Sequence, residues 1–396
     1  GVPAALVEVT PLTWLPSSLA TPFERMGGDP MPHENAWRQL LVFGAVAVFG
    51  AACVVGLRTV GSARAAVEWG VIQAVMFSSV ALAHNLSDST LTYWKFYDPV
   101  YRMGGPQFPH DNQQVAYQLL LLSGALAAGF ARGETAPFAR LPWRRAWLVG
   151  AILLTYAGTV TCRPRSGLLL GTVLVVGALG LKALRAKPEH RRRVLGLSAA
   201  GGVALLIALA TVGPLRENVA RFGEFAARPS AVFTGGNFRP LQHQVAWAMV
   251  RDRPWFGWGG GSYLYLSPAY APRVPEMMHA LRSQRQNHRP IFPHADGDWL
   301  EFVVEYGLVG AALLVTIAAG WLAWVLGRIR SLGTASLVMA AGVMLVLAQA
   351  LIDPVLRNPA VLGALVAVAW IAVMLQSERE SRLARAQAAV AKPGKV

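Results

Sequence analysis

Long apolar runs recur along the chain and are separated by polar segments. A membrane-spanning helix needs about 20 mostly apolar residues, because each residue adds about 1.5 Å and the hydrocarbon core is about 30 Å thick. The pattern therefore predicts an all-α polytopic membrane protein with about nine transmembrane helices. The expected spans are residues 37–57, 67–84, 113–131, 146–161, 166–181, 194–213, 299–326, 331–352 and 360–375.

Composition supports this class, since 54% of the 396 residues are hydrophobic and only 14% are charged. The formal net charge of +15 is spread over the connections between spans, and no soluble basic domain is present to bind nucleic acid. Cys53 lies within a span and Cys162 lies at the end of another, so a disulfide framework is not expected.

Basic residues gather in alternate connections between the spans. Because Lys and Arg accumulate on the cytoplasmic side of a membrane, this pattern predicts the orientation of the spans. The pattern places one large external loop between the sixth and seventh helices, in the periplasm of a bacterial inner (cytoplasmic) membrane. The expected domains are an external N-terminal segment (1–36), a first transmembrane helix group (37–213), a large periplasmic loop with the candidate active site (214–298), C-terminal transmembrane helices (299–376) and a basic cytoplasmic tail (377–396).

Two arginines face outward in the short turn "CRPR", where Arg163 and Arg165 flank Pro164. Guanidinium groups present forked donors that match phosphate oxygens, so a lipid-linked diphosphate is one possible ligand. The alternative is that both side chains reach the phosphates of ordinary membrane lipids.

A glycine-rich stretch, "RPWFGWGGGSYLYL" (253–266), lies in the predicted external loop. Its glycines permit backbone angles that other residues avoid, and they allow close approach to a ligand. Trp258, Gly259 and Tyr263 are candidates for binding a glycan or for shaping the loop. The alternative is an aromatic belt at the membrane interface.

The stretch "PHADGDWLEFVVEYGLVG" (293–310) places ionisable residues directly before an apolar span. His294 can take a proton from a hydroxyl, and Asp296 can orient it or serve as the base itself. Asp298 is a further candidate for binding the glycan or shaping the loop. The alternative is that Asp298 and Glu301 suit the N-terminus of a helix, where negative charge is favourable. The histidines and carboxylates show no metal-ligand spacing, so neither a metal nor a cofactor is expected.

Three stretches in this order resemble the O-antigen ligase and O-antigen polymerase superfamily of bacterial membrane proteins. They are "VTCRPRSGLLLG" (160–171), "RPLQHQVAWAMVRDRPWFGWGGGSYLYL" (239–266) and "HADGDWLEFVVEYGLVG" (294–310). The resemblance covers residues 161–326 well and the earlier helices poorly.

The resemblance implies a metal-independent, inverting glycosyltransferase. Its donor would be a glycan on undecaprenyl diphosphate, and its acceptor a lipid A core, a protein or a saccharide. Arg165 matches the first arginine of the family and Arg239 is the best match for the second, with Arg163, Arg253 and Arg289 as further candidates for the diphosphate.

One departure from the family pattern concerns the base. The family histidine falls at Asp296, and the histidine of this chain lies two residues earlier, at His294. Three alternatives follow: His294 reaches the acceptor, Asp296 is the base, or the chain is a non-catalytic subunit that retains the fold. A polysaccharide polymerase that uses the same donor is the alternative to a ligase.

Overall fold

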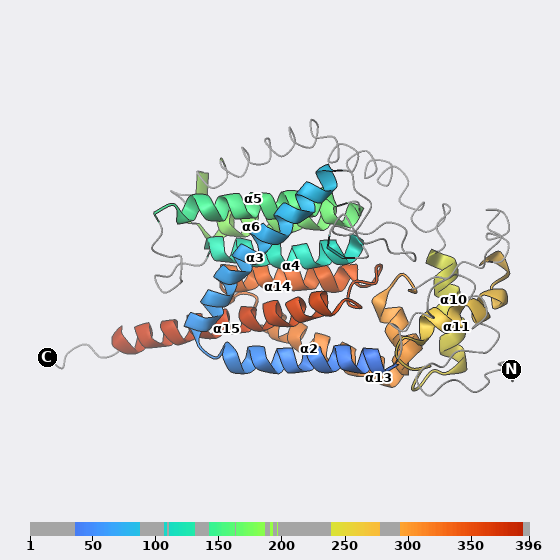
Figure 1. Ribbon diagram of the computed structural model, residues 1–396. Helices are drawn as coiled ribbons and strands as arrows, with labels where there is room; N and C mark the ends of the chain where they lie inside the picture. Colours follow the sequence, from blue (N-terminus) through green and yellow to red (C-terminus); the bar gives the residue numbers. More distant parts are fainter. Residues whose placement is uncertain are drawn as a thin grey trace. The chain divides into compact units, whose positions relative to one another are not determined.

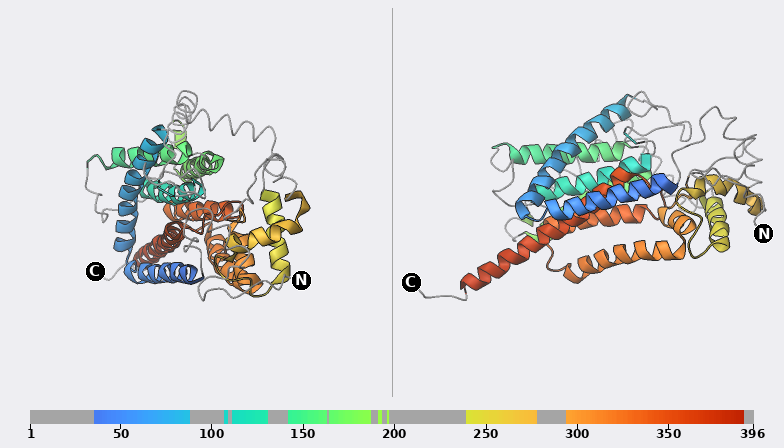
Figure 2. Two further views of the ribbon diagram at one scale, coloured as in Figure 1. Left: turned by 45° about the vertical axis from the view of Figure 1, so that its right-hand side comes forward. Right: turned by 60° about the horizontal axis from the view of Figure 1, so that its bottom comes forward.

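The computed structural model describes residues 36–87, 107–108, 111–130, 142–162, 164–186, 191–192, 196, 239–277 and 294–390. These residues form helices joined by turns, with no β-strand among them (Figures 1 and 2). In chain order the elements are α2 (Ala36–Gly56), α3 (Val60–Leu86), α4 (Asp111–Phe130), α5 (Arg144–Thr161), α6 (Arg165–Arg185), α10 (Arg239–Asp252), α11 (Ser262–Tyr270), the 3₁₀ helix η1 (Ala271–Arg273), α13 (Asp298–Arg328), α14 (Thr334–Gln349) and α15 (Pro359–Val390).

Within the described residues, 5 helices are long and apolar enough to cross a membrane: Gln39–Gly56, Gly61–His84, Ser166–Arg185, Asp298–Arg328 and Pro359–Ala384. The predicted all-helical class is thereby confirmed for the described residues, and the candidate spans suit a multi-pass membrane protein. The expected spans 113–131 and 146–161 form α4 and α5. The expected span 194–213 lies, except for residue 196, outside the described residues, so the count of nine and the position of the large loop remain predictions.

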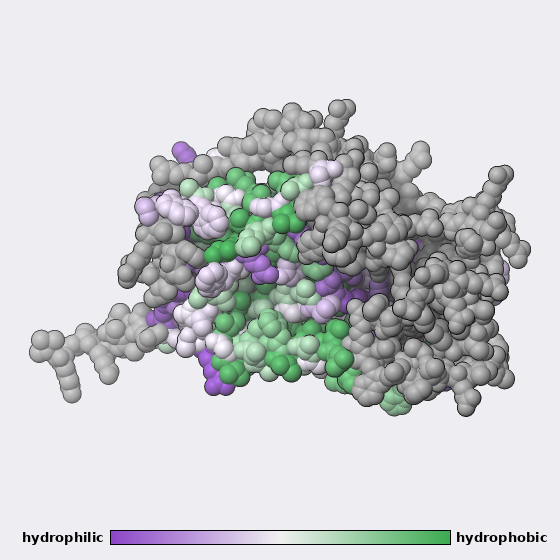
Figure 3. Space-filling view, viewed as in Figure 1, coloured by the Kyte–Doolittle hydropathy of each residue, from purple (hydrophilic) through white to green (hydrophobic). Residues whose placement is uncertain are grey.

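Large apolar side chains are exposed on the spans, and hydrophobic residues cover much of the described surface on the face that Figure 3 shows. On α2 the exposed large side chains are Leu40, Leu41, Val48, Phe49, Val54 and Val55. Contiguous apolar surface of this kind is unfavourable in water and suits contact with lipid.

The chain forms two compact units that are interleaved along the sequence. The first comprises residues 1–48, 225–323 and 350–359, and the second comprises residues 49–224, 324–349 and 360–396. The first unit contains α10, α11 and most of α13, whereas the second contains α3, α4, α5, α6 and α14.

In the second unit, α4 is the central helix and packs against α3, α5, α6 and α14. Two polar residues of the predicted span 67–84, Glu68 and Gln73, have partners on neighbouring helices. The buried carboxylate of Glu68 lies 2.9 Å from Nη2 of Arg144, and Gln73 donates a hydrogen bond of 2.5 Å to the hydroxyl of Tyr117. Polar groups in an apolar helix are expected to pair in this way, because lipid offers no hydrogen bonds.

In the first unit, α13 is broken at Gly307, which has φ 67° and ψ −175° and changes the direction of the helix (Figure 2). The glycine-rich turn after α10 lies against this break. Trp258 and Gly259 donate backbone hydrogen bonds to the carbonyls of Val304 (3.0 Å) and Glu305 (2.8 Å). A Cβ on Gly307 would lie 2.2 Å from the carbonyl oxygen of Trp255, so the two backbones touch where only glycine fits.

We expect Gly307→Ala to destabilise the protein by at least about 1–3 kcal/mol, the strain of a non-glycine residue held at positive φ. The overlap with Trp255 adds to this value. Gly320→Ala is the matched control on the same helix, because no atom lies within 4 Å of its added Cβ, and it should be neutral or stabilising by up to about 1 kcal/mol. The free energy of unfolding in detergent measures both; equal effects would show that the contact at Gly307 is unimportant.

Candidate active site

The first segment of α13, before the break, carries three carboxyl groups on one face. Asp298, Glu301 and Glu305 are spaced by three and four residues, the spacing at which helical side chains lie above one another. All three are at most 2% exposed. Buried carboxylates in such a row repel one another, so they require a cation among them.

Arg357, from the segment between α14 and α15, supplies that cation. Its Nη1 lies 2.6 Å from Oε2 of Glu305, and its Nη2 lies 3.0 Å from Oε1 of Glu301. Burial alone would lower the pKa of Arg357, but the two glutamates raise it above its usual value. The guanidinium therefore stays charged and bridges two successive turns of α13.

Asp298 holds the segment that carries Arg357. Its carboxylate accepts a hydrogen bond of 2.6 Å from the backbone N–H of Leu356, and its own N–H donates to the carbonyl of Ala350 at 2.9 Å. Asp298 was predicted as a site residue or as a favourable charge at a helix start. The structure shows that its carboxylate binds the backbone beside Arg357.

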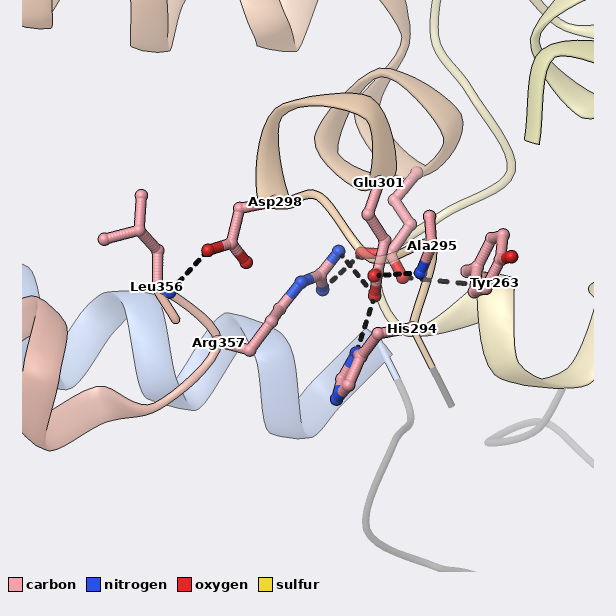
Figure 4. A network of polar contacts seen from close by, with 8 residues as sticks. Tyr263, His294, Ala295, Asp298, Glu301, Leu356 and Arg357 are labelled. Atoms are coloured by element: carbon pink, nitrogen blue, oxygen red, sulfur yellow. Dashed lines mark hydrogen bonds and ion pairs between the residues drawn. The ribbon is translucent and has the colours of Figure 1, made fainter. Parts of the chain in front are cut away.

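His294 joins the same network through Glu301, as Figure 4 shows. Its Nδ1 lies 3.1 Å from Oε1 of Glu301, and the other oxygen of Glu301 accepts the N–H of Ala295 at 2.9 Å. A carboxylate accepts hydrogen bonds only, so this contact places a proton on Nδ1 of the imidazole. In the neutral ring Nε2 then keeps its lone pair, which is the state that a general base requires.

Asp296 occupies an unusual position in the loop before α13. It is the one non-glycine residue with positive φ (53°) among the described residues. Its carboxylate lies 3.7 Å from Nε of Arg239, whose Nη2 also contacts Asp353 at 3.0 Å. Burial raises the pKa of Asp296, while Arg239, His294 and His243 act in the opposite direction. Backbone strain of this kind is concentrated at functional sites.

A second imidazole lies beside this loop. Nε2 of His243, on α10, is buried and has no hydrogen-bond partner among the described residues. A Cβ added to Gly297 would lie 3.9 Å from this nitrogen and 3.0 Å from the carbonyl oxygen of Leu351. The backbone next to Asp296 therefore lies near an imidazole nitrogen, which can donate or accept a hydrogen bond, and near a carbonyl oxygen, which can accept one.

The aromatic and glycine residues predicted for the site lie in the glycine-rich stretch that follows α10. Trp258 is buried in the core of the first unit, where its Nε1 donates to the carbonyl of Met249 at 2.9 Å and the guanidinium of Arg253 stacks 4.3 Å from its ring. Tyr263 is 1% exposed, and burial raises the pKa of its hydroxyl well above the usual value. The backbone contact of Gly259 and the burial of Trp258 favour loop shaping, one of the two roles predicted for them.

The predicted arginines are only partly described. Arg163 and Arg289 lie outside the described residues, and Arg165 begins α6 in the second unit with its side chain undescribed. Arg239, His294, Asp296 and Asp298 are brought together in the first unit. No group of residues suited to hold a metal ion occurs in the part of the chain that the structure describes.

The sequence interpretation missed Glu305, Arg357, Asp353 and His243 and gave Glu301 only a helix-dipole role. Two signals were present. Carboxyl groups at 298, 301 and 305 follow a helical period inside an otherwise apolar span, and "DPVLRNP" (353–359) places one arginine in a short connection between two such spans. Neither signal indicates that the two segments meet.

The sequence profile of the O-antigen ligase family matches residues 144–315. The match includes α5, α6, α10, α11 and the carboxylate-bearing segment of α13, and it ends before Asp353 and Arg357. A comparison with curated proteins finds no match to the chain.

Proposed function

We propose that the protein transfers a glycan from undecaprenyl diphosphate to an acceptor hydroxyl, because residues 144–315 match the sequence profile of the O-antigen ligase family. The observation that supports this most directly is the contact of 3.1 Å between His294 and Glu301. A histidine whose second nitrogen is held by a carboxylate is a common arrangement of a general base in group transfer.

In the proposed reaction, Nε2 of His294 takes the proton of the acceptor hydroxyl while its oxygen attacks the anomeric carbon. The bond from this carbon to the diphosphate oxygen breaks on the opposite face, so the configuration inverts. Glu301 stabilises the imidazolium that forms, and Arg357 keeps Glu301 ionised and in place. No metal is required, because guanidinium groups can stabilise the charge on the leaving diphosphate.

We assign the diphosphate to the arginines of the predicted set: Arg163, Arg165, Arg239, Arg253 and Arg289. Arg239 is supported by its place beside Asp296 and by the 30% of its side chain that remains exposed. Asp296 would accept a hydrogen bond from the acceptor sugar, with His243 and the carbonyl of Leu351 bordering the same loop. The periplasmic face of an inner membrane is the expected location of this site.

Incubation of the purified protein with a labelled lipid-linked oligosaccharide and candidate acceptors tests the proposal. A single new conjugate on a lipid A core, protein or saccharide is the expected result for a ligase, whereas a ladder of lengths indicates a polymerase. Absence of both, with donors and acceptors that serve a known ligase, would favour the non-catalytic subunit.

The pH dependence distinguishes the two proposed proton-binding residues. Protonation of His294 removes the base, and protonation of Asp296 removes a hydrogen-bond acceptor, so activity must fall as the pH is lowered. Since burial raises the pKa of Asp296, this loss begins at a higher pH than for an ordinary aspartate. Asparagine resembles the protonated acid, so we expect Asp296→Asn to lower the rate at neutral pH and to lose the part of the acid-side fall that Asp296 causes, which leaves a limiting slope of about 1 from His294. A rate and a pH profile that are both unchanged in this variant would remove Asp296 from the proposal.

A further inference from the structure

The turn between α10 and α11 exposes two large aromatic side chains. Trp255 is 64% exposed and Phe256 is 78% exposed, more than any aromatic residue of the hydrophobic cluster beneath them. Such a pair is unfavourable in water. An apolar environment around both side chains would remove this cost.

The turn cannot withdraw these side chains, because its backbone is hydrogen-bonded to α13. Leu308 donates to the carbonyl of Pro254 at 2.7 Å, and Val309 donates to the carbonyl of Trp255 at 3.1 Å. The pair at 255–256 is therefore held beside the first residues that follow the break in α13.

The character of α13 changes at this break. The segment before it carries the buried carboxyl groups, and the segment after it has no ionisable residue until Arg328. Its large exposed side chains before Arg328 are apolar and include Leu308, Val309, Leu313, Val315 and Ile317, and the hydroxyl of Thr316 donates to the carbonyl of Ala312 within the helix. This row suits contact with acyl chains.

Helix length agrees with a membrane boundary at the break. The whole of α13 has 31 residues, which gives about 46 Å and exceeds the hydrocarbon thickness of about 30 Å. From Leu308 to Arg328 the helix is about 31 Å long, which matches that thickness. At the far end, the guanidinium of Arg328 lies 5.4 Å from the ring of Trp324, a combination typical of a membrane interface.

We propose that Trp255 and Phe256 insert into the lipid bilayer at the boundary between head groups and acyl chains, level with Leu308. The partner is the phospholipid surface itself, and the turn acts as a fixed anchor for α10 and α11. Arg251 is exposed and lies four residues before Trp255, so it suits the lipid phosphates. The anchor also places the segment with Glu301 immediately outside the hydrocarbon, and it is independent of the reaction proposed above.

A spin-label depth measurement tests this anchor. In a protein with Cys53→Ala and Cys162→Ser, single cysteines replace Phe256, Leu313 as the lipid-facing reference, or Gln244 as an exposed polar reference on α10. Each is labelled with a nitroxide and reconstituted into phospholipid nanodiscs. Collisions with oxygen, which concentrates in lipid, are compared with collisions with a water-soluble nickel chelate.

The ratio of oxygen collisions to nickel collisions is expected to be several-fold higher for the label at 256 than for the label at 244. It should approach the ratio for the label at 313. A label at 256 as accessible to nickel as the one at 244 would overturn the proposal. Because Phe256 is 78% exposed, its replacement removes little packing. Glycan transfer is not needed for the readout, so a failure of the proposed function leaves this test valid.

Discussion

We expect His294→Gln to lower the rate of glycan transfer by about 10²–10⁴-fold, the contribution of a positioned general base. The glutamine side chain retains hydrogen-bonding capacity toward Glu301 but cannot take up a proton from the acceptor. Single-turnover rates with saturating donor and acceptor measure the effect. Gln244→Ala, an exposed change on α10, is the control and should leave the rate within a factor of about two.

A double-mutant cycle with Glu301 shows whether the two residues act together. Glu301→Gln should slow transfer, because its amide no longer stabilises the imidazolium, and the double variant should be little slower than His294→Gln alone. Additive losses would show that Glu301 acts on the rate independently of His294. A rate for His294→Gln close to that of the wild type would eliminate the assigned base.

Removal of Arg357 should produce the largest loss of stability, about 3–5 kcal/mol for Arg357→Met, because it leaves buried carboxylates without their cation. Its side chain is 4% exposed and pairs with Glu301 and Glu305. Arg382→Met is the matched control: Arg382 pairs with Glu378 but is 54% exposed, so its loss should change stability by about 0–1 kcal/mol. Denaturant unfolding in detergent compares the two.

A second substitution identifies the cause of this loss. Adding Glu305→Gln to Arg357→Met removes one of the uncompensated charges, so the double variant should be more stable than Arg357→Met alone. If the double variant is less stable by the sum of both single changes, the guanidinium stabilises the segment by other contacts, such as the ring of Phe302 at 5.2 Å, rather than by neutralising Glu305.

The candidate base could be predicted from sequence because it lies in a local pattern. His294 and Asp296 precede an apolar helix within one motif, and both are found beside the buried network. Their roles could not be separated in this way. The contact of His294 with Glu301 requires the turn of the loop at Asp296 and Gly297, and this geometry is not encoded in residue spacing alone.

The glycine-rich stretch illustrates the opposite case. Its composition is compatible with a ligand loop and with an interfacial belt, and the structure separates its residues between different roles. Trp258 is buried, Gly257 and Gly259 allow backbone contact with α13, and Trp255 and Phe256 remain exposed. The sequence shows which residues the stretch contains and in which order. Their roles depend on which side of the folded turn faces the break in α13.

The linear pattern of apolar runs was enough to predict a helical membrane protein, because spanning lipid depends on the length and composition of one continuous segment. The order of three motifs was likewise sufficient to indicate the family. The pairing of Arg357, from a connection late in the chain, with Glu305 and with Glu301, which contacts His294, is apparent only in three dimensions. Pairing of buried charges depends on distance in space, and segments far apart in sequence become neighbours only when the chain folds.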